Sequence, residues 1–106
     1  MKYNVQGVLQ FQIFQIPFVG ADTCGFSKLK SPIPIRDMTD LFLDGNTDEE
    51  LCNRWMQLSA FMPFYRNHNV KGALPQEPYR WDSIANASRI AMEIRYSLLP
   101  YWVSKY

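Results

Sequence analysis

The sequence has little that would point to a membrane or to nucleic acid. Its 106 residues include no apolar run close to the roughly 20 residues that a membrane-spanning helix needs, so we expect no membrane partner. The formal net charge is only +1, which gives no reason to expect binding to nucleic acid. The first residues, MKYNVQG, lack the apolar stretch and cleavage site of a signal peptide, so we predict no leader.

Histidine and cysteine are also scarce, and both bear on metal binding. The chain has one histidine, His68, and two cysteines, Cys24 and Cys52. With a single histidine, and with no second cysteine two to four residues from either one, we expect no metal site. We also expect no cofactor. The residues alone leave the two thiols either paired or free and buried.

Aromatic residues, by contrast, are abundant. Seven Phe, six Tyr and three Trp make up 15% of the chain. A domain of this length buries only about 60–70% of the surface of its unfolded chain. We therefore expect either that some aromatic side chains stay exposed or that the chain is part of a larger fold.

The first part of the chain predicts a helix followed by a strand. Apolar residues recur at near-helical spacing over residues 5–16, and Pro17 ends that helix because proline cannot continue it. Residues 18–21 predict a buried strand. Residues 27–44 contain two prolines, mixed charge and no sustained period, which indicates a long loop.

The next part predicts a second helix and a second strand. The helix lies within residues 45–62, where Asn46 or Thr47 can cap it and Pro63 stops it. Residues 64–66 predict a short strand. The apolar stripe expected on the helix consists of Leu51, Trp55, Leu58 and Met62.

A proline-bearing loop then leads to a last helix. That helix is predicted to begin at about Asp82, and Pro100 is expected to bend or end it. Four further aromatic residues are assigned to packing: Trp55, Tyr79, Trp81 and Tyr96.

Strands that alternate with helices are typical of a parallel sheet, so the predicted fold class is α/β. Two parallel strands cannot form a stable sheet alone, and the chain therefore corresponds to a slice of a barrel or of a doubly wound sheet. In such folds ligands meet the carboxyl ends of the strands. Both predicted strands end in polar clusters, at residues 22–26 and 66–69, which predicts a binding site there.

The candidates for ligand contact in these clusters are Asp22, Phe26, Arg66 and His68. Each also has an ordinary structural explanation when it is taken alone. The aspartate could cap a loop, the histidine could be structural, the phenylalanine could belong to the core, and the arginine could form a surface ion pair.

Four stretches of the sequence carry a resemblance to a known family: VGADTCGF, GNTDEELCNRWMQLSAFMPFYRNHN, PQEPYRW and RYSLLPY. Together they resemble glycoside hydrolase family 31, the α-glucosidase family, and are most similar to its fungal and lysosomal-type members. The resemblance implies that residues 1–106 are a single fragment of a catalytic (β/α)8 TIM barrel. The fragment would comprise helix 6, strand 7, helix 7, strand 8 and helix 8, with residues 27–44 as an insertion.

The resemblance also implies roles for the four candidate residues. Asp22 would lie at the floor of the pocket that holds the terminal glucose, and His68 would hydrogen-bond a glucose hydroxyl. Phe26 would line the mouth, where the next sugar or aglycone stacks. Arg66 would hold the strand end through charge-assisted bonds. In the same way the resemblance implies a disulfide between the two cysteines, Cys24 and Cys52.

The implied activity is that of a retaining α-glucosidase, which hydrolyses O-glycosyl bonds of α-glucosides such as maltose and starch-type oligosaccharides. A retaining glycosidase needs two carboxylates about 5–5.5 Å apart, as nucleophile and acid/base. In the family both precede the region that this chain resembles. We therefore expect no catalytic residue in this chain, and we expect the isolated chain to be inactive.

Other possibilities stay open at this point. The chain could be a noncatalytic carbohydrate-binding or interaction remnant, or its parent could be an α-xylosidase or an α-glucan lyase of the same family. Members of the family are secreted, lysosomal or vacuolar, and the location and oligomeric state of this chain are left open. We hypothesise that residues 27–44, and with them the terminal WVSKY, are translated intron that packs poorly.

Overall fold

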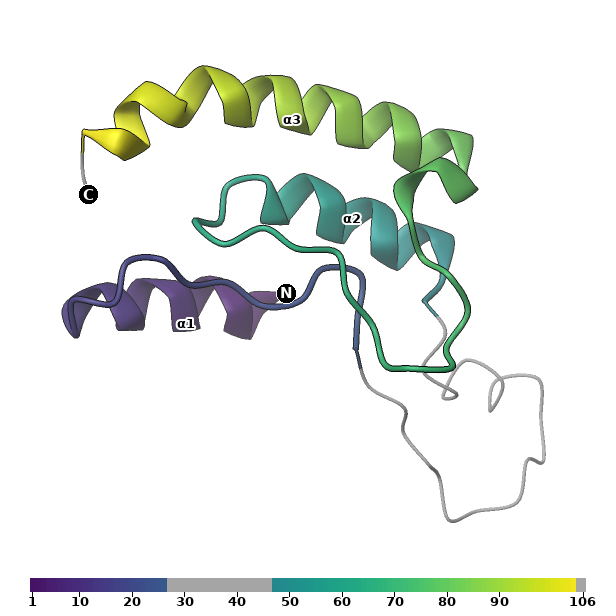
Figure 1. Cartoon of the computed structure of the whole chain (residues 1–106), viewed down its shortest axis with the longest axis horizontal. Helices are drawn as coiled ribbons and strands as arrows, with labels where there is room; N and C mark the ends of the chain where they lie inside the picture. Colours follow the sequence, from purple (N-terminus) through teal and green to yellow (C-terminus); the bar gives the residue numbers. More distant parts are fainter. Residues whose placement is uncertain (27–46, 105–106) are drawn as a thin grey trace, which may run out of the picture.

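The computed structural model describes residues 1–26 and 47–104, which form helices joined by extended segments (Figure 1). In chain order the helices are α1 (Lys2–Ile13), α2 (Glu49–Ser59), the short 3₁₀ helix η2 (Pro78–Arg80) and α3 (Asp82–Val103). α3 packs against α2 and against η2. In Figure 1, α2 lies between α3 and α1.

The two predicted strands, at residues 18–21 and 64–66, do not form in the part of the chain that the structure describes. The two segments do run side by side in the same direction, and Thr23 and Asn67 form an isolated parallel bridge. A lasting strand needs a ladder of hydrogen bonds and a third element to cover it, which two short segments lack. The predicted α/β class is therefore not seen in these residues, which are helical and extended.

A glycine allows the two segments to approach closely. Phe64 donates its N–H to the carbonyl of Val19 at 3.2 Å. A Cβ added to Gly20 would collide with the carbonyl oxygen of Phe64. Any larger residue at this position would push the segments apart.

The helix predicted at residues 5–16 forms as α1, Lys2–Ile13, three residues earlier at each end. Gln15 adopts a left-handed conformation, with φ 59°, which ends the helical path. Pro17 adds to this effect because its ring disfavours a helical conformation of Ile16. No residue of α1 is buried.

α2 is capped by Asp48, and not by Asn46 or Thr47 as predicted. Oδ1 of Asp48 accepts a hydrogen bond from the N–H of Leu51 at 2.9 Å. The hydroxyl of Thr47 donates instead to the carbonyl of Cys24. Asn46 lies outside the described residues.

The buried face of α2 differs from the predicted stripe. The buried residues of the helix are Cys52, Met56 and Ser59. Of the predicted stripe only Met62, which lies beyond the end of the helix, is buried. The disulfide explains the difference, because Cys52 has to face Cys24.

α3 begins at Asp82, as predicted, and continues through Pro100 as far as Val103, so this proline does not end the helix. The helix has few buried residues, and they follow helical spacing along one side: Ile84, Ser88 and Ala91.

The core is small and is centred on a disulfide. Cys24 and Cys52 are bonded, with an S–S distance of 2.06 Å, which confirms the pairing that the family resemblance implied. Both are fully buried, together with Met56 and Ile84. The half-buried side chains that pack around this cluster are Trp55, Tyr65 and Trp81.

Arg95 joins α3 to the chain that follows α2. Its guanidinium donates to the main-chain carbonyls of Ala60, Met62 and Pro63, at 2.9, 2.6 and 3.0 Å. It also lies over the ring of Tyr65, 5.3 Å from the centroid. Carbonyls at and beyond the end of a helix need partners from outside it, and here a neighbouring helix supplies one.

Many aromatic side chains remain exposed, as the composition led us to expect. Of the four assigned to packing, Trp55 and Trp81 do pack against the core cluster. Tyr79 and Tyr96 are 79% and 68% exposed, so their assignment is wrong for this chain. The core cluster is too small to reach them.

None of the helices that the structure describes is both long enough and apolar enough to cross a membrane. The predicted insertion at residues 27–44 lies outside the described residues, as do the last two residues of the terminal WVSKY.

Replacing Cys52 with serine should lower the free energy of unfolding by about 3–4 kcal/mol, because the disulfide closes a loop across a sequence separation of 28 residues. Urea unfolding followed by tryptophan fluorescence measures this loss. The double variant Cys24→Ser/Cys52→Ser should lose no more than the single variant, since the same bond is removed once. A reductant that leaves the wild-type midpoint unchanged would contradict the prediction.

Candidate functional site

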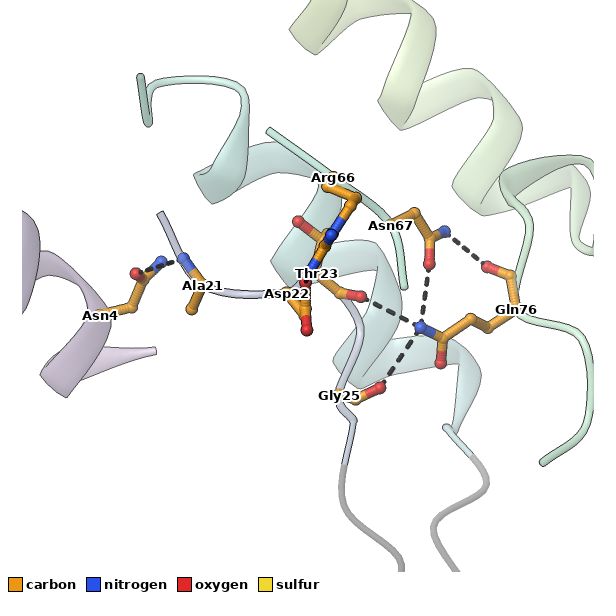
Figure 2. A network of polar contacts seen from close by, with 8 residues as sticks. All are labelled: Asn4, Ala21, Asp22, Thr23, Gly25, Arg66, Asn67 and Gln76. Carbon is orange, nitrogen blue, oxygen red and sulfur yellow. Dashed lines mark hydrogen bonds and ion pairs between the residues drawn. The ribbon is translucent and has the colours of Figure 1, made fainter. Parts of the chain in front are cut away.

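The two polar clusters lie side by side, as the sequence predicts (Figure 2). The N–H of Thr23 donates to the carbonyl of Arg66 at 2.8 Å, and this bond belongs to the parallel bridge between Thr23 and Asn67. Side chains alternate between the two faces of an extended segment. Arg66 and His68 therefore share one face, and Asn67 lies on the other.

Asp22 and Arg66 form an ion pair between the two clusters. Nε and Nη2 of Arg66 donate to Oδ1 of Asp22 at 2.9 and 2.6 Å. The aspartate side chain is 21% exposed and the arginine side chain is 51% exposed. Hydrogen bonds between two charged groups are short and directional, so the arginine fixes the orientation of the carboxylate.

Phe26 and His68 form the second contact between the clusters. Their ring centroids are 5.1 Å apart and the ring planes are tilted by 33°. Both side chains are exposed. The four predicted site residues thus come together as two contacting pairs, and each pair takes one member from each cluster.

A tight turn separates Asp22 from Phe26. Cys24 has φ 76° and Gly25 has φ 104°, both in the left-handed region. Glycine adopts this conformation freely, whereas another residue pays roughly 1–2 kcal/mol. The disulfide with Cys52 and the hydroxyl of Thr47, which donates to the Cys24 carbonyl, hold the turn in place.

Gln76 is a central residue that the sequence reasoning missed. It is 4% exposed, and its Nε2 donates to the carbonyls of Thr23 and Gly25 at 3.1 and 3.3 Å and to Oδ1 of Asn67 at 2.9 Å (Figure 2). Asn67 donates its Nδ2 to the main-chain carbonyl of Gln76 at 2.8 Å. The one available signal was the stretch PQEPYRW, which carried the family resemblance but had no role assigned to its glutamine.

A cavity of about 240 Å³ opens beside His68, and its polar lining residues are Asn67, His68, Asn69, Gln76 and Glu77. Asp22, Phe26 and Arg66 do not line this cavity. The four predicted residues are thus in contact, and of the four only His68 lines this cavity.

The acidic residues near the start of α2 are engaged elsewhere. Asp48 caps the helix, Glu50 pairs with Arg54, and Glu49 accepts a bond from the hydroxyl of Ser83. Among the residues that the structure describes, no group of three His, Cys, Asp or Glu side chains could hold a metal ion.

The comparisons with known proteins agree on one family. The family model for the glycosyl hydrolases family 31 TIM-barrel domain matches residues 1–105. The chain is 55% identical over 102 residues to an alpha-glucosidase of Aspergillus oryzae and 53% identical over 102 residues to an alpha-glucosidase of Aspergillus niger. It is 55% identical over 100 residues to an alpha-glucosidase of Candida tsukubaensis.

The similarity covers almost all of this chain but little of each relative. The matches span 94–96% of the chain and 8–9% of the three relatives. The chain therefore spans less than a tenth of the length of the curated relatives that it matches.

Tyr65, which precedes the ion-paired Arg66, should make the stability of the chain depend on pH in the alkaline range. Burial raises the pKa of Tyr65 from 10.0 to about 12, and the nearby charge of Arg95 acts in the opposite direction. The folded state keeps the phenol proton that the unfolded chain releases above pH 10.0, so stability should fall as the pH rises from 10.0 to about 12.

The variant Tyr65→Phe has no phenol proton to release at this position. Its free energy of unfolding should therefore fall less than that of the wild type as the pH rises from 10.0 to about 12. Urea unfolding at a series of pH values measures it. Tyr79→Phe, which removes an exposed phenol, is the matched control and should behave as the wild type does. An unchanged pH dependence in Tyr65→Phe would contradict the prediction.

Proposed function

Since the chain belongs to the TIM-barrel domain of glycosyl hydrolase family 31, we propose that it supplies part of the sugar-binding pocket of a retaining α-glucosidase. The names of its relatives support this activity. Because the chain spans less than a tenth of those relatives, we assign the activity to a longer protein that contains it. The substrates would be α-glucosides such as maltose and starch-type oligosaccharides.

In the longer protein, the extended segments around residues 18–24 and 64–68 would become the seventh and eighth strands of a (β/α)8 barrel. Their parallel direction and the bridge between them support this assignment. So does an apolar hollow of about 410 Å³ between α1, the segment at residues 19–21 and Trp55. Side chains from the rest of the barrel would fill that hollow. The helices α1, α2 and α3 would be the sixth, seventh and eighth helices of the barrel.

The observation that carries the proposal is the pair of contacts between the two clusters. A sugar offers hydroxyl groups at its edges and apolar C–H groups on its faces, so it is bound by carboxylate and imidazole groups together with aromatic rings. Both bonds between Asp22 and Arg66 fall on Oδ1, and we assign Oδ2 to a glucose hydroxyl. His68 would bond a second hydroxyl, and Phe26 would present its ring at the mouth of the pocket.

The chemical step would come from outside this chain. A retaining glycosidase needs two carboxylates about 5–5.5 Å apart, whereas Asp22 is ion-paired with Arg66 and the acids at the start of α2 have other partners. We therefore assign the nucleophile and the acid/base to other parts of the longer protein.

The isolated chain should not hydrolyse maltose or an aryl α-glucoside above the uncatalysed background, because we assign the two catalytic carboxylates to other parts of the longer protein. Release of glucose, measured with a coupled assay, tests this. Turnover that disappears in Asp22→Asn or His68→Ala would show that the chain carries catalytic groups of its own. Such a result would overturn this part of the proposal.

In the longer enzyme, His68→Ala should cost roughly 1–3 kcal/mol in kcat/KM for maltose, because a glucose hydroxyl loses its partner in a desolvated site. The loss should appear in kcat as well as in KM if the bond strengthens in the transition state. Gln57→Ala, on the exposed side of α2, is the control. Unchanged kinetics in His68→Ala would return this histidine to a structural role.

A further inference from the structure

The buried carboxamide of Gln76 is held through its nitrogen, while its Oε1 is buried with no hydrogen-bond partner among the described residues. Its Nε2 has two hydrogens and faces three acceptors, the carbonyls of Thr23 and Gly25 and Oδ1 of Asn67. Each of these three partners is an oxygen atom. A side chain that cannot donate a hydrogen bond would therefore leave these oxygens unpaired in a buried place.

Each acceptor belongs to a residue that is adjacent in the sequence to a proposed sugar contact. Thr23 follows Asp22, Gly25 precedes Phe26, and Asn67 lies between Arg66 and His68. Neighbouring side chains in an extended segment point to opposite faces. Gln76, which bonds Asn67 on the inner face and the main chain at Thr23 and Gly25, therefore sets the position of the side chains on the outer face, where Arg66 and His68 lie. Its three bonds go to neighbours of the four proposed sugar contacts and not to the four residues themselves.

The hydrogen bonds of Gln76 also hold both ends of the left-handed turn at Cys24 and Gly25. The carbonyl before the turn belongs to Thr23 and the one at its end belongs to Gly25, and Gln76 binds both. A non-glycine residue with positive φ persists only where its surroundings hold it. The direction in which the chain leaves the turn decides where the ring of Phe26 lies over His68.

We propose that Gln76 is a positioning residue of the sugar site, whose carboxamide fixes the register of the two clusters and the turn that leads to Phe26. The inference rests on the proposed function, because it assumes that the two clusters bind a sugar. It adds a residue that touches no sugar but sets the geometry of those that do.

The test uses the longer enzyme with glucose as the probe, and glucose affinity is measured as competitive inhibition of maltose hydrolysis. Gln76→Met keeps the length of the side chain and removes the donor. Gln76→Glu keeps the shape and places an acceptor against three oxygens. Glucose affinity should fall by about tenfold or more in the methionine variant and by more in the glutamate variant.

A stability control separates positioning from folding. Ala91→Gly weakens the buried side of α3 and should lower the melting temperature while glucose affinity stays within about twofold of the wild type. In the enzyme without sugar, amide hydrogen exchange over residues 22–26 should be faster in Gln76→Met than in the wild type or in Ala91→Gly.

The outcomes distinguish the two proposals. If Gln76→Met loses stability as Ala91→Gly does but keeps wild-type glucose affinity, the residue is only structural and this inference is overturned, whereas the proposed function stands. Wild-type glucose affinity in either variant would overturn the requirement for a donor, because neither replacement side chain supplies one. If the glutamate variant does not fold, the methionine variant still decides. A wild-type enzyme that does not bind glucose would overturn the proposed function and this inference with it.

Discussion

The parallel main-chain pairing of the two extended segments sets the register of the two polar clusters at residues 22–26 and 66–69. In it the N–H of Thr23 donates to the carbonyl of Arg66 at 2.8 Å and the N–H of Phe64 donates to the carbonyl of Val19 at 3.2 Å. The side-chain period of an extended segment is two, so a slip of one residue would exchange its faces. Arg66 and His68 would then point to the inner side, and both contacts between the clusters would be lost at once. The site therefore stands or falls with this register.

The main role of the helices is to hold the two clusters in this register. The disulfide fastens the first cluster to α2 through Cys52, and Arg95 fastens the chain before the second cluster to α3. Gln76 joins the two clusters to each other. These connections end on main-chain carbonyls, on the buried disulfide and on the side-chain oxygen of Asn67, which faces inward, so the outer faces of the clusters keep their polar and aromatic groups for a ligand.

The sequence predicts those features whose causes lie nearby in the chain. The last helix starts at Asp82 where its periodic pattern starts, and the pairing of Cys24 with Cys52 follows from a family motif. The two predicted strands do not form in the described residues, because a strand is stabilised by neighbouring strands that this part of the chain does not supply. No pattern in the sequence predicts the role of Gln76. A side chain that binds main-chain carbonyls requires neither a periodic position nor a particular polar residue elsewhere in the sequence.

The charges at the proposed site suit a neutral ligand. Asp22 and Arg66 compensate each other, so the pair does not attract or repel a sugar through net charge. Recognition of an uncharged ligand then depends on the directions of hydrogen bonds and on the placement of a ring, and both weaken steeply when groups shift. A neutral carboxamide such as that of Gln76 can hold the main chain in place without adding a charge that would disturb this balance. The accuracy of the scaffold, rather than electrostatic attraction, is what such a site requires.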